Sequence, residues 1–226
     1  MAILSRWPIG EVRLIELPSP ESYQFDFERM VGRHVALVAR IAHPERPFIA
    51  VTSHLEVHRT RAHRATQVRT LLEALRGERQ PIVYAGDFNT HTFDRGRWWD
   101  PLLGAAALVL WPDRALARRL LHPDRSGTRE RLFDELTRHG FEWKPYVDRA
   151  PTLQLRFERL DELRGFPDFA QRAVRNVLAW AERRGQLKLD WFAGRGWYRG
   201  EGLTVQGLDG PGKASDHAPI VARFEW

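Results

Sequence analysis

The strongest constraint on the fold is a strand–helix–strand pattern between residues 48 and 85. Residues 48–53 form a nearly continuous apolar run, and residues 82–85 form a second run that stops at Gly86. Short apolar runs bounded by turn residues are typical of buried central strands. Between them, residues 59–76 carry apolar side chains at three- and four-residue steps, which predicts a helix with one buried face: Ala62, Ala65, Val68, Leu72 and Leu75. This spacing predicts a crossover connection between two parallel strands.

Other segments extend this unit into an α/β domain. Three further apolar runs predict strands at residues 35–41, 187–192 and 219–224. Three helices are predicted at residues 102–121, which Pro112 is expected to split, at 128–139 and at 168–184. Thr128 is the expected N-cap of the second, and Gly77 and Gly140 are expected to end helices in the left-handed conformation. We predict a single domain over residues 1–226 with a helical insertion at about residues 98–185.

Composition narrows the class of protein. The chain has no cysteine, which excludes disulfides and thiolate metal sites. No run approaches the ~20 apolar residues of a membrane-spanning helix, and the first residues do not resemble a secretory leader. The cytoplasm is therefore slightly favoured, and the sequence predicts no oligomeric state.

The formal charge of +6 suits a polyanionic partner such as DNA or RNA. Only three of the 35 basic residues are lysines, Lys144, Lys188 and Lys213. The many arginines, together with many alanines and leucines, are equally typical of a GC-rich genome, so charge alone does not establish nucleic-acid binding.

Polar residues with chemical potential lie at the ends of the predicted strands. His54 follows the first strand of the crossover unit, and Asp87 and Asn89 follow the second. Asp190 lies in the run at 187–192, and Asp216-His217 precedes the last strand. Functional groups gather at such positions because rigid strands hold exposed loops there.

Each of these signals is weak on its own. Asp87 and Asn89 are two residues apart, so an extended segment points both toward one face, where their oxygens can hold a water or a hard metal ion. A histidine after a strand is more often structural, and Asp-x-Asn after glycine is more often turn chemistry. Asp190 alone fits a buried acid paired with an arginine.

The order of the motifs resembles the endonuclease/exonuclease/phosphatase (DNase I-like) superfamily. The matching segments are Ser-His-Leu at 53–55, Gly-Asp-Phe-Asn at 86–89, Leu-Asp-Trp-Phe at 189–192 and Ser-Asp-His-Ala-Pro-Ile at 215–220. Residues 2–9 resemble the family's strand that follows its metal-binding glutamate, and Arg61 or Arg64 with Gln67 is also typical. The resemblance covers the whole chain and is weakest over residues 98–185. It implies an α/β fold in which two sheets form a sandwich flanked by helices (α/β/β/α).

The resemblance also implies a phosphoesterase that uses Mg²⁺ or Mn²⁺ and in-line attack of water on phosphorus. Asp87 would orient and deprotonate the water and contribute to the metal site with Asp216. Asn89 would hold the water and a phosphoryl oxygen. His217 would bind the phosphoryl group, while Asp190 would fix its tautomer and favour the imidazolium.

His54 would stabilise the phosphate or protonate the leaving oxygen. His54 and His58 are four residues apart, which raises zinc as an alternative. A zinc pair at this spacing requires a helix, whereas His54 lies at a strand end and no third nitrogen or sulfur ligand is near. We disfavour zinc and expect His58 and His63 to face solvent.

Arginine and aromatic residues follow Asp190 in a predicted loop. Arg195 and Arg199 are candidate substrate-binding residues there, since arginine binds phosphate and the neighbouring Trp197 and Tyr198 offer flat surfaces. The alternative, a glycine-rich turn whose aromatic residues pack on the core, is favoured. Residues 98–99, both tryptophan, either line the site or seal the insertion.

The chain departs from the family at its front. The family has a strand ending in Asn and then a metal-binding Glu before the motif that here begins at Ala2, and no residue matches either. Glu11, Glu16 and Glu28 come after the motif. We expect a chain that lacks its N-terminal strands, because the other catalytic residues are intact, and an exposed sheet edge that lowers solubility or alters assembly. A non-catalytic phosphate- or nucleic-acid-binding module, and a lipid or inositol phosphoesterase, are the alternatives.

Overall fold

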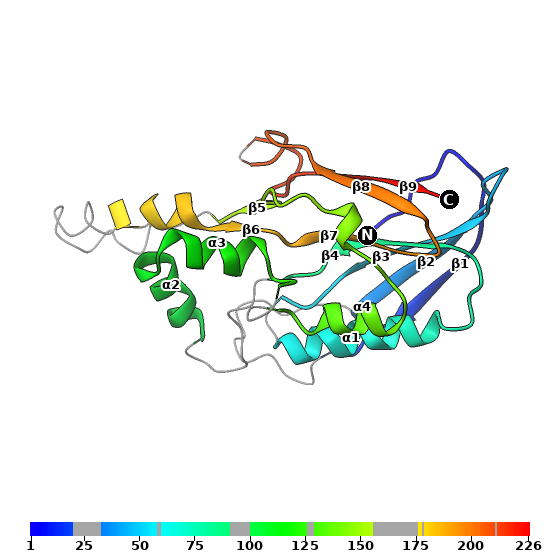
Figure 1. The fold of residues 1–226 in the computed structure, drawn as a ribbon, viewed down its shortest axis with the longest axis horizontal. Coiled ribbons are helices and arrows are strands. Elements are labelled where there is room, and N and C mark those ends of the chain that lie inside the picture. Colours follow the sequence, from blue (N-terminus) through cyan, green and yellow to red (C-terminus); the bar gives the residue numbers. More distant parts are fainter. Residues whose placement is uncertain are drawn as a thin grey trace.

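The computed structural model describes residues 1–19, 33–57, 60–90, 100–125, 129–155, 176–177, 179–210 and 212–226, without the side chains of 100–103 and 105. Its main feature is a five-stranded sheet of order β1-β2-β3-β4-β7 (Figure 1). These strands are β1 (Ile9–Glu16), β2 (Val35–Ile41), β3 (Phe48–His54), β4 (Ile82–Asp87) and β7 (Asp190–Arg195). Two short sheets pair β5 (Leu153–Gln154) with β6 (Gln186–Leu187), and β8 (Arg199–Thr204) with β9 (Ile220–Glu225). The helices are α1 (Arg61–Ala74), α2 (Asp100–Leu110), α3 (Asp113–Leu121), α4 (Leu132–Arg138) and the 3-10 turn η1 (Lys144–Tyr146).

The predicted crossover unit is confirmed. β3 and β4 pair in parallel with α1 between them, so His54 lies beside Asp87 at one edge of the sheet. β7 then pairs antiparallel with β4, which brings Asp190 directly opposite Asp87. Three segments that are far apart in sequence therefore end or begin at the same edge.

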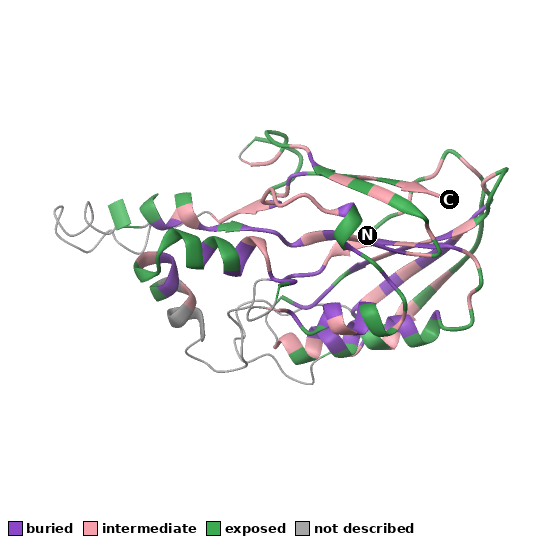
Figure 2. Cartoon of the chain, viewed as in Figure 1, coloured by how far each residue is buried: buried purple, intermediate pink, exposed green. Residues whose placement is uncertain are grey.

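Helices α1 and α4 cover one face of the large sheet (Figure 1). The main core lies between these helices and the sheet. It includes five fully buried residues: Leu71, Leu72, Phe133, Tyr84 and Trp191. Figure 2 shows this core as the buried side of α1 and of the central strands. α4 falls within the predicted insertion, yet it belongs to this core.

Strands β8 and β9 face the other side of the large sheet. Phe224 of β9 stacks on Tyr146 at 4.1 Å between ring centroids and contacts Phe192 of β7. Gly200 and Gly202 make room for Tyr146, since a Cβ at either position would lie within 2 Å of its atoms. The outer residues of this pair, including Leu203 and Val221, are exposed. α2 and α3 lie beyond the end of the large sheet, with α3 beside β6, and form a second, smaller core with residues 181–189 (Figure 1).

Several local predictions are confirmed and others are corrected. Pro112 separates α2 from α3, and Gly140 follows α4 with a φ of +75°. Gly77 was expected to be a left-handed cap, but α1 ends earlier, with Leu75 as its C-cap, and Gly77 has no positive φ. The predicted strand at 187–192 is divided between β6 and β7, and β8 was not predicted. Residues 2–9 were expected to resemble a family strand, but residues 2–8 form no strand and β1 begins at Ile9.

Some predicted features lie outside the described residues: Thr128, His58, Glu28, residues 98–99 and most of the helix at 168–184, whose described end at 179–184 is helical. None of the described helices is both long and apolar enough to cross a bilayer.

Candidate active site

Asp87, Asp190 and His217 converge at the edge where β4 ends and β7 begins. One ligand atom from each lies within 4.8 Å of the others, and among the described residues this is the group of acids and histidines with metal-binding spacing. His217 Nδ1 lies 2.7 Å from Asp190 Oδ2. All three side chains are partly buried, so they are shielded from water and still reachable. The structure therefore brings together three of the residues that the motif order predicted.

The two carboxylates lie directly opposite one another on neighbouring antiparallel strands. Like charges in this arrangement repel. Burial and the charge of Asp190 both raise the pKa of Asp87, while a hydrogen bond from the Asn89 backbone N–H to Asp87 Oδ1 (2.9 Å) opposes the shift. Asp87 is therefore a stronger base than an ordinary aspartate.

His217 carries the compensating positive charge. Its hydrogen bond with Asp190 raises its pKa to about 9, against the opposing effect of burial, and the charges of Asp87 and Asp216 add to the rise. At neutral pH the ring is an imidazolium, which donates from Nδ1 to Asp190 and keeps the second N–H for another acceptor.

Asn89 is a buried residue that connects the strand ends at the site. It has a φ of +48°, a left-handed conformation that asparagine tolerates better than most residues. Its side-chain Nδ2 donates to the Leu55 carbonyl (2.6 Å), and the Leu55 N–H donates to the Asp87 carbonyl (2.9 Å). These bonds tie the ends of β3 and β4 together, and Asn89 is only 3% exposed.

His54 and Asp216 are more exposed than the three convergent residues. The His54 side chain is 59% exposed, and its Nε2 lies 3.6 Å from Asp87 Oδ2. Asp216 is exposed and adjoins His217, although it is not one of the three convergent residues.

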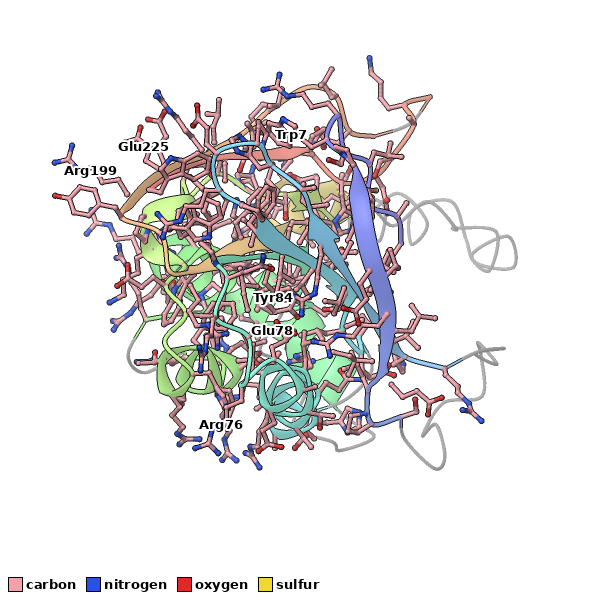
Figure 3. The ribbon with its side chains drawn as sticks, turned by 90° about the vertical axis from the view of Figure 1, so that its right-hand side faces the viewer. Trp7, Arg76, Glu78, Tyr84, Arg199 and Glu225 are labelled. Carbon is pink, nitrogen blue, oxygen red and sulfur yellow. The ribbon has the colours of Figure 1, made fainter. Side chains whose placement is uncertain are left out.

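The structure does not bring Arg195 and Arg199 to this group. Arg195 is opposite Ile82 and Arg199 is opposite Glu225, at the far end of their strands from Asp87 and Asp190. Figure 3 views that end and shows Arg199 at the periphery, away from the interior Tyr84. Arg195 donates to the carbonyls of Leu75 and Glu78 (3.0 and 2.9 Å).

The aromatic residues between these arginines have different environments. Trp197 packs against Phe224 and Phe48, as the packing alternative predicted, whereas Tyr198 is exposed. The turn between β7 and β8 reverses the chain at the end of the sheet remote from Asp190.

Arg64 and Gln67 of helix α1 form contacts that stabilise the fold and are not among the convergent site residues. Arg64 is fully buried and pairs with Glu130 at 2.9 Å. Gln67 accepts the Glu56 N–H (3.0 Å) and donates to the Pro18 carbonyl (2.9 Å). His63, expected to face solvent, is partly buried.

Two buried polar residues beside the site had no signal in motif or spacing. Thr152 is 0% exposed and accepts the N–H of Asp190, and Lys188 is 1% exposed and lies in the segment that leads into Asp190, where it donates to Thr204. Neither follows a predicted strand, and neither stands in one of the matching motifs.

The charges and donor atoms of the group fit a hard divalent cation. Asp87, Asp190 and Asp216 bring three negative charges near one imidazolium, so the site has an excess of negative charge. Carboxylate oxygens are the ligands that Mg²⁺ and Mn²⁺ prefer. Because the pKa of His217 is raised to about 9, both ring nitrogens carry a proton at neutral pH, and the carboxylates rather than the ring are the candidate ligands.

Comparison with known proteins identifies a family and similar folds. The model of the endonuclease/exonuclease/phosphatase family matches residues 1–217. Similar solved structures include an endonuclease/exonuclease/phosphatase family protein from Leptotrichia buccalis (TM-score 0.54, 11% identity, 98% of this chain and 64% of that one). A functionally unknown conserved protein from Enterococcus faecalis (0.52, 16%, 96% and 66%) and truncated TDP2 from Caenorhabditis elegans (0.50, 12%, 97% and 68%) are also similar. The chain spans about two thirds of the length of each. No curated protein matches it in sequence.

Proposed function

Because the chain belongs to the endonuclease/exonuclease/phosphatase family, we propose that it hydrolyses phosphodiester or phosphomonoester bonds with the help of Mg²⁺ or Mn²⁺. Water attacks phosphorus in line with the leaving oxygen. The observation that supports this most directly is the convergence of Asp87, Asp190 and His217 at one edge of the sheet.

Asp87 accepts the proton of the attacking water. Burial and the charge of Asp190 raise its pKa in the absence of the cation, and its Oδ1 is held by the Asn89 N–H. Asn89 is proposed to help hold the water and a phosphoryl oxygen through its remaining amide oxygen. His54, exposed and beside Asp87, is placed to contact the phosphate or the leaving oxygen.

His217 binds the phosphoryl group as an imidazolium. With a pKa of about 9 it stays protonated through the neutral range, so it offers a charged N–H donor throughout the reaction. Asp190 holds the ring in place and keeps it charged. Asp87 and Asp216 would hold the cation, which would neutralise charge on the phosphoryl oxygens.

Nucleic acid is the slightly favoured substrate. The formal charge of +6 attracts a phosphodiester backbone, although it does not exclude a lipid or an inositol phosphate.

The test is hydrolysis of bis(p-nitrophenyl) phosphate with Mg²⁺ or Mn²⁺ and with a chelator. We expect metal-dependent turnover that Asp216→Ala and His217→Gln reduce by about 100-fold or more, while Glu201→Gln, an exposed acid on β8, leaves it unchanged. A folded protein that binds phosphate or DNA without turnover would identify a binding module instead.

A further inference from the structure

Thr152 joins three segments of the chain at the candidate site. It is completely buried and lies just before β5. Its N–H donates to the Leu187 carbonyl and its carbonyl accepts the Ala218 N–H, both at 2.8 Å. Its hydroxyl oxygen accepts the N–H groups of Leu189 (2.9 Å) and Asp190 (3.2 Å).

We infer that Thr152 is a positioning residue for the Asp190–His217 pair, an inference that rests on the proposed phosphoesterase function. Through its hydroxyl it holds the backbone of Asp190, and through its carbonyl it holds the residue that follows His217. One residue thus anchors both sides of the 2.7 Å bond between the carboxylate and the ring. The β-bridge between Leu153 and His217 extends the same contact.

The hydroxyl has a specific task here. Buried N–H groups need acceptors, and those of Leu189 and Asp190 both find theirs in a side chain as β7 begins. A single hydroxyl oxygen has two lone pairs, so it can accept both. Valine has nearly the same shape but no acceptor, and serine keeps the acceptor without the methyl group.

The segment that carries Thr152 is itself fixed on the other side. Asp148 accepts the Thr204 N–H (2.6 Å) and lies 3.2 Å from the Nζ of Lys188, which also donates to Thr204 Oγ1 (2.8 Å). Lys188 is two residues before Asp190. Residues 148–154 therefore bind the start of β7 at two points, which limits the freedom of Thr152 to shift.

The test compares Thr152→Val with Thr152→Ser, and uses Thr137→Val as the matched control. Thr137 donates its hydroxyl to Phe133 on α4, away from the site. Two readouts are needed: hydrogen exchange of individual amides by NMR, and kcat and KM for bis(p-nitrophenyl) phosphate with Mg²⁺.

In Thr152→Val we expect the amides of Leu189 and Asp190 to exchange about tenfold faster, with exchange in α1 and α4 unchanged. The kcat should fall about 10- to 100-fold, as for residues that orient a catalytic group, while KM changes little. Thr152→Ser should restore both values, and Thr137→Val should alter neither.

The inference is overturned if Thr152→Val keeps both the amide protection and kcat, if Thr137→Val loses as much, or if Thr152→Ser recovers protection without activity. If the unaltered protein shows no turnover, the proposed function fails separately. The amide exchange then decides alone whether the hydroxyl holds Asp190, and unchanged exchange overturns the inference. If Thr152→Val does not fold, Thr152→Ala takes its place under the same criteria.

Discussion

The electrostatics of the site depend on one hydrogen bond between His217 and Asp190. A neutral histidine would be a weak partner for a phosphoryl oxygen at physiological pH, because an ordinary imidazole is largely deprotonated there. Asp190 changes this by stabilising the charged ring at 2.7 Å. At neutral pH the pair therefore supplies a cation beside Asp87, the proposed base.

Asp190→Asn tests this directly. We expect the pKa of His217 to fall from about 9 toward its ordinary value near 6.5, because the largest cause of the rise is removed. The measurement is an NMR titration of the ring protons, and Glu201→Gln is the control. A His217 pKa that stays near 9 in Asp190→Asn would contradict the assignment.

The same shift affects stability. A histidine whose folded pKa is raised contributes stability that is fully present below about pH 6.5 and is lost as pH rises through about 9. The difference in unfolding free energy between the unaltered protein and Asp190→Asn should therefore be larger at pH 6 than at pH 10.

Asp87 shows the opposite relation between charge and stability. Burial and Asp190 raise its pKa, so the charged form is unfavourable in the folded protein, and stability declines as pH rises through that pKa. Without a divalent cation, Asp87→Asn should raise the unfolding free energy at pH 7 by about 1 kcal/mol and abolish turnover.

Thermal unfolding with and without Mn²⁺ checks both parts of this prediction. The cation should raise the melting temperature of the unaltered protein and should have much less effect on Asp87→Asn. Equal shifts in the two proteins would remove Asp87 from the metal site.

At the residue scale, the order of the motifs predicted that the residues at these strand ends belong to one site. The ends of β3 and β4 and the start of β7 do lie together, because β3 and β4 are parallel and β4 and β7 are antiparallel. It predicted Asp87, Asp190 and His217 as one group. It did not predict the distance between Asp190 and Arg195, because both were assigned to one region although β7 carries them to opposite ends. Thr152 gave no signal, since its role depends on contacts made only after folding.

Among the elements, β3 and β4 approach each other so closely that only glycine fits at one position. A Cβ on Gly86 would lie 2.0 Å from the Ser53 carbonyl oxygen. This explains the glycine of Gly-Asp-Phe-Asn physically, because any side chain there would push apart the strands that carry His54 and Asp87.

Gly86→Ala should therefore destabilise the protein by about 2 kcal/mol or more and lower turnover in the protein that remains folded. Gly77→Ala is the matched control. A Cβ at Gly77 meets nothing within 4 Å and its φ is not positive, so that change should be neutral or slightly stabilising. Chemical denaturation of the two variants measures the contrast, and equal effects would contradict the close-approach argument.

The same reasoning explains why β8 was not predicted as a strand. Its sequence Arg-Gly-Glu-Gly-Leu-Thr begins with four charged or glycine residues, and only Leu203 and Thr204 at its end are of the apolar or β-branched kind that indicates a strand. Gly200 and Gly202 leave space for Tyr146 of η1, which packs directly against the backbone of β8. A contact between segments, rather than the residues of β8 alone, therefore stabilises this strand. Strands defined by their own apolar pattern, such as β2, were predicted at their observed bounds.

At the scale of the whole molecule, several apolar strand residues are exposed on the surface. Val12 and Leu14 on the edge strand β1 are 54% and 64% exposed, and Val221 on β9 is 55% exposed. Such edges pair with other copies unless charge or covering segments prevent it.

We therefore expect concentration-dependent self-association, measured by sedimentation, that Leu14→Lys reduces. Leu110→Lys, the same change at an exposed leucine on α2, is the control and should have less effect. A sharp, reversible melt of a monomer at all concentrations would contradict this expectation.

The net charge of the protein affects which substrate it binds rather than how the bond is hydrolysed. A net charge of +6 attracts any polyanion, but only a phosphodiester backbone that contacts several arginines releases many counterions on binding. If three phosphates are contacted, the affinity for duplex DNA should fall with a slope of about −2.7 against the logarithm of salt, roughly 40-fold between 50 and 200 mM. Fluorescence anisotropy with a labelled duplex, in a chelator to prevent cleavage, measures this.

Turnover of the small chromogenic diester over the same salt range is the control, because it contacts only the catalytic group and should change little. A steep slope for DNA with a flat one for the diester would place extended nucleic acid on the basic surface. Flat dependence for both would remove charge as an argument for a nuclease and would leave the lipid and inositol phosphates as the classes to test.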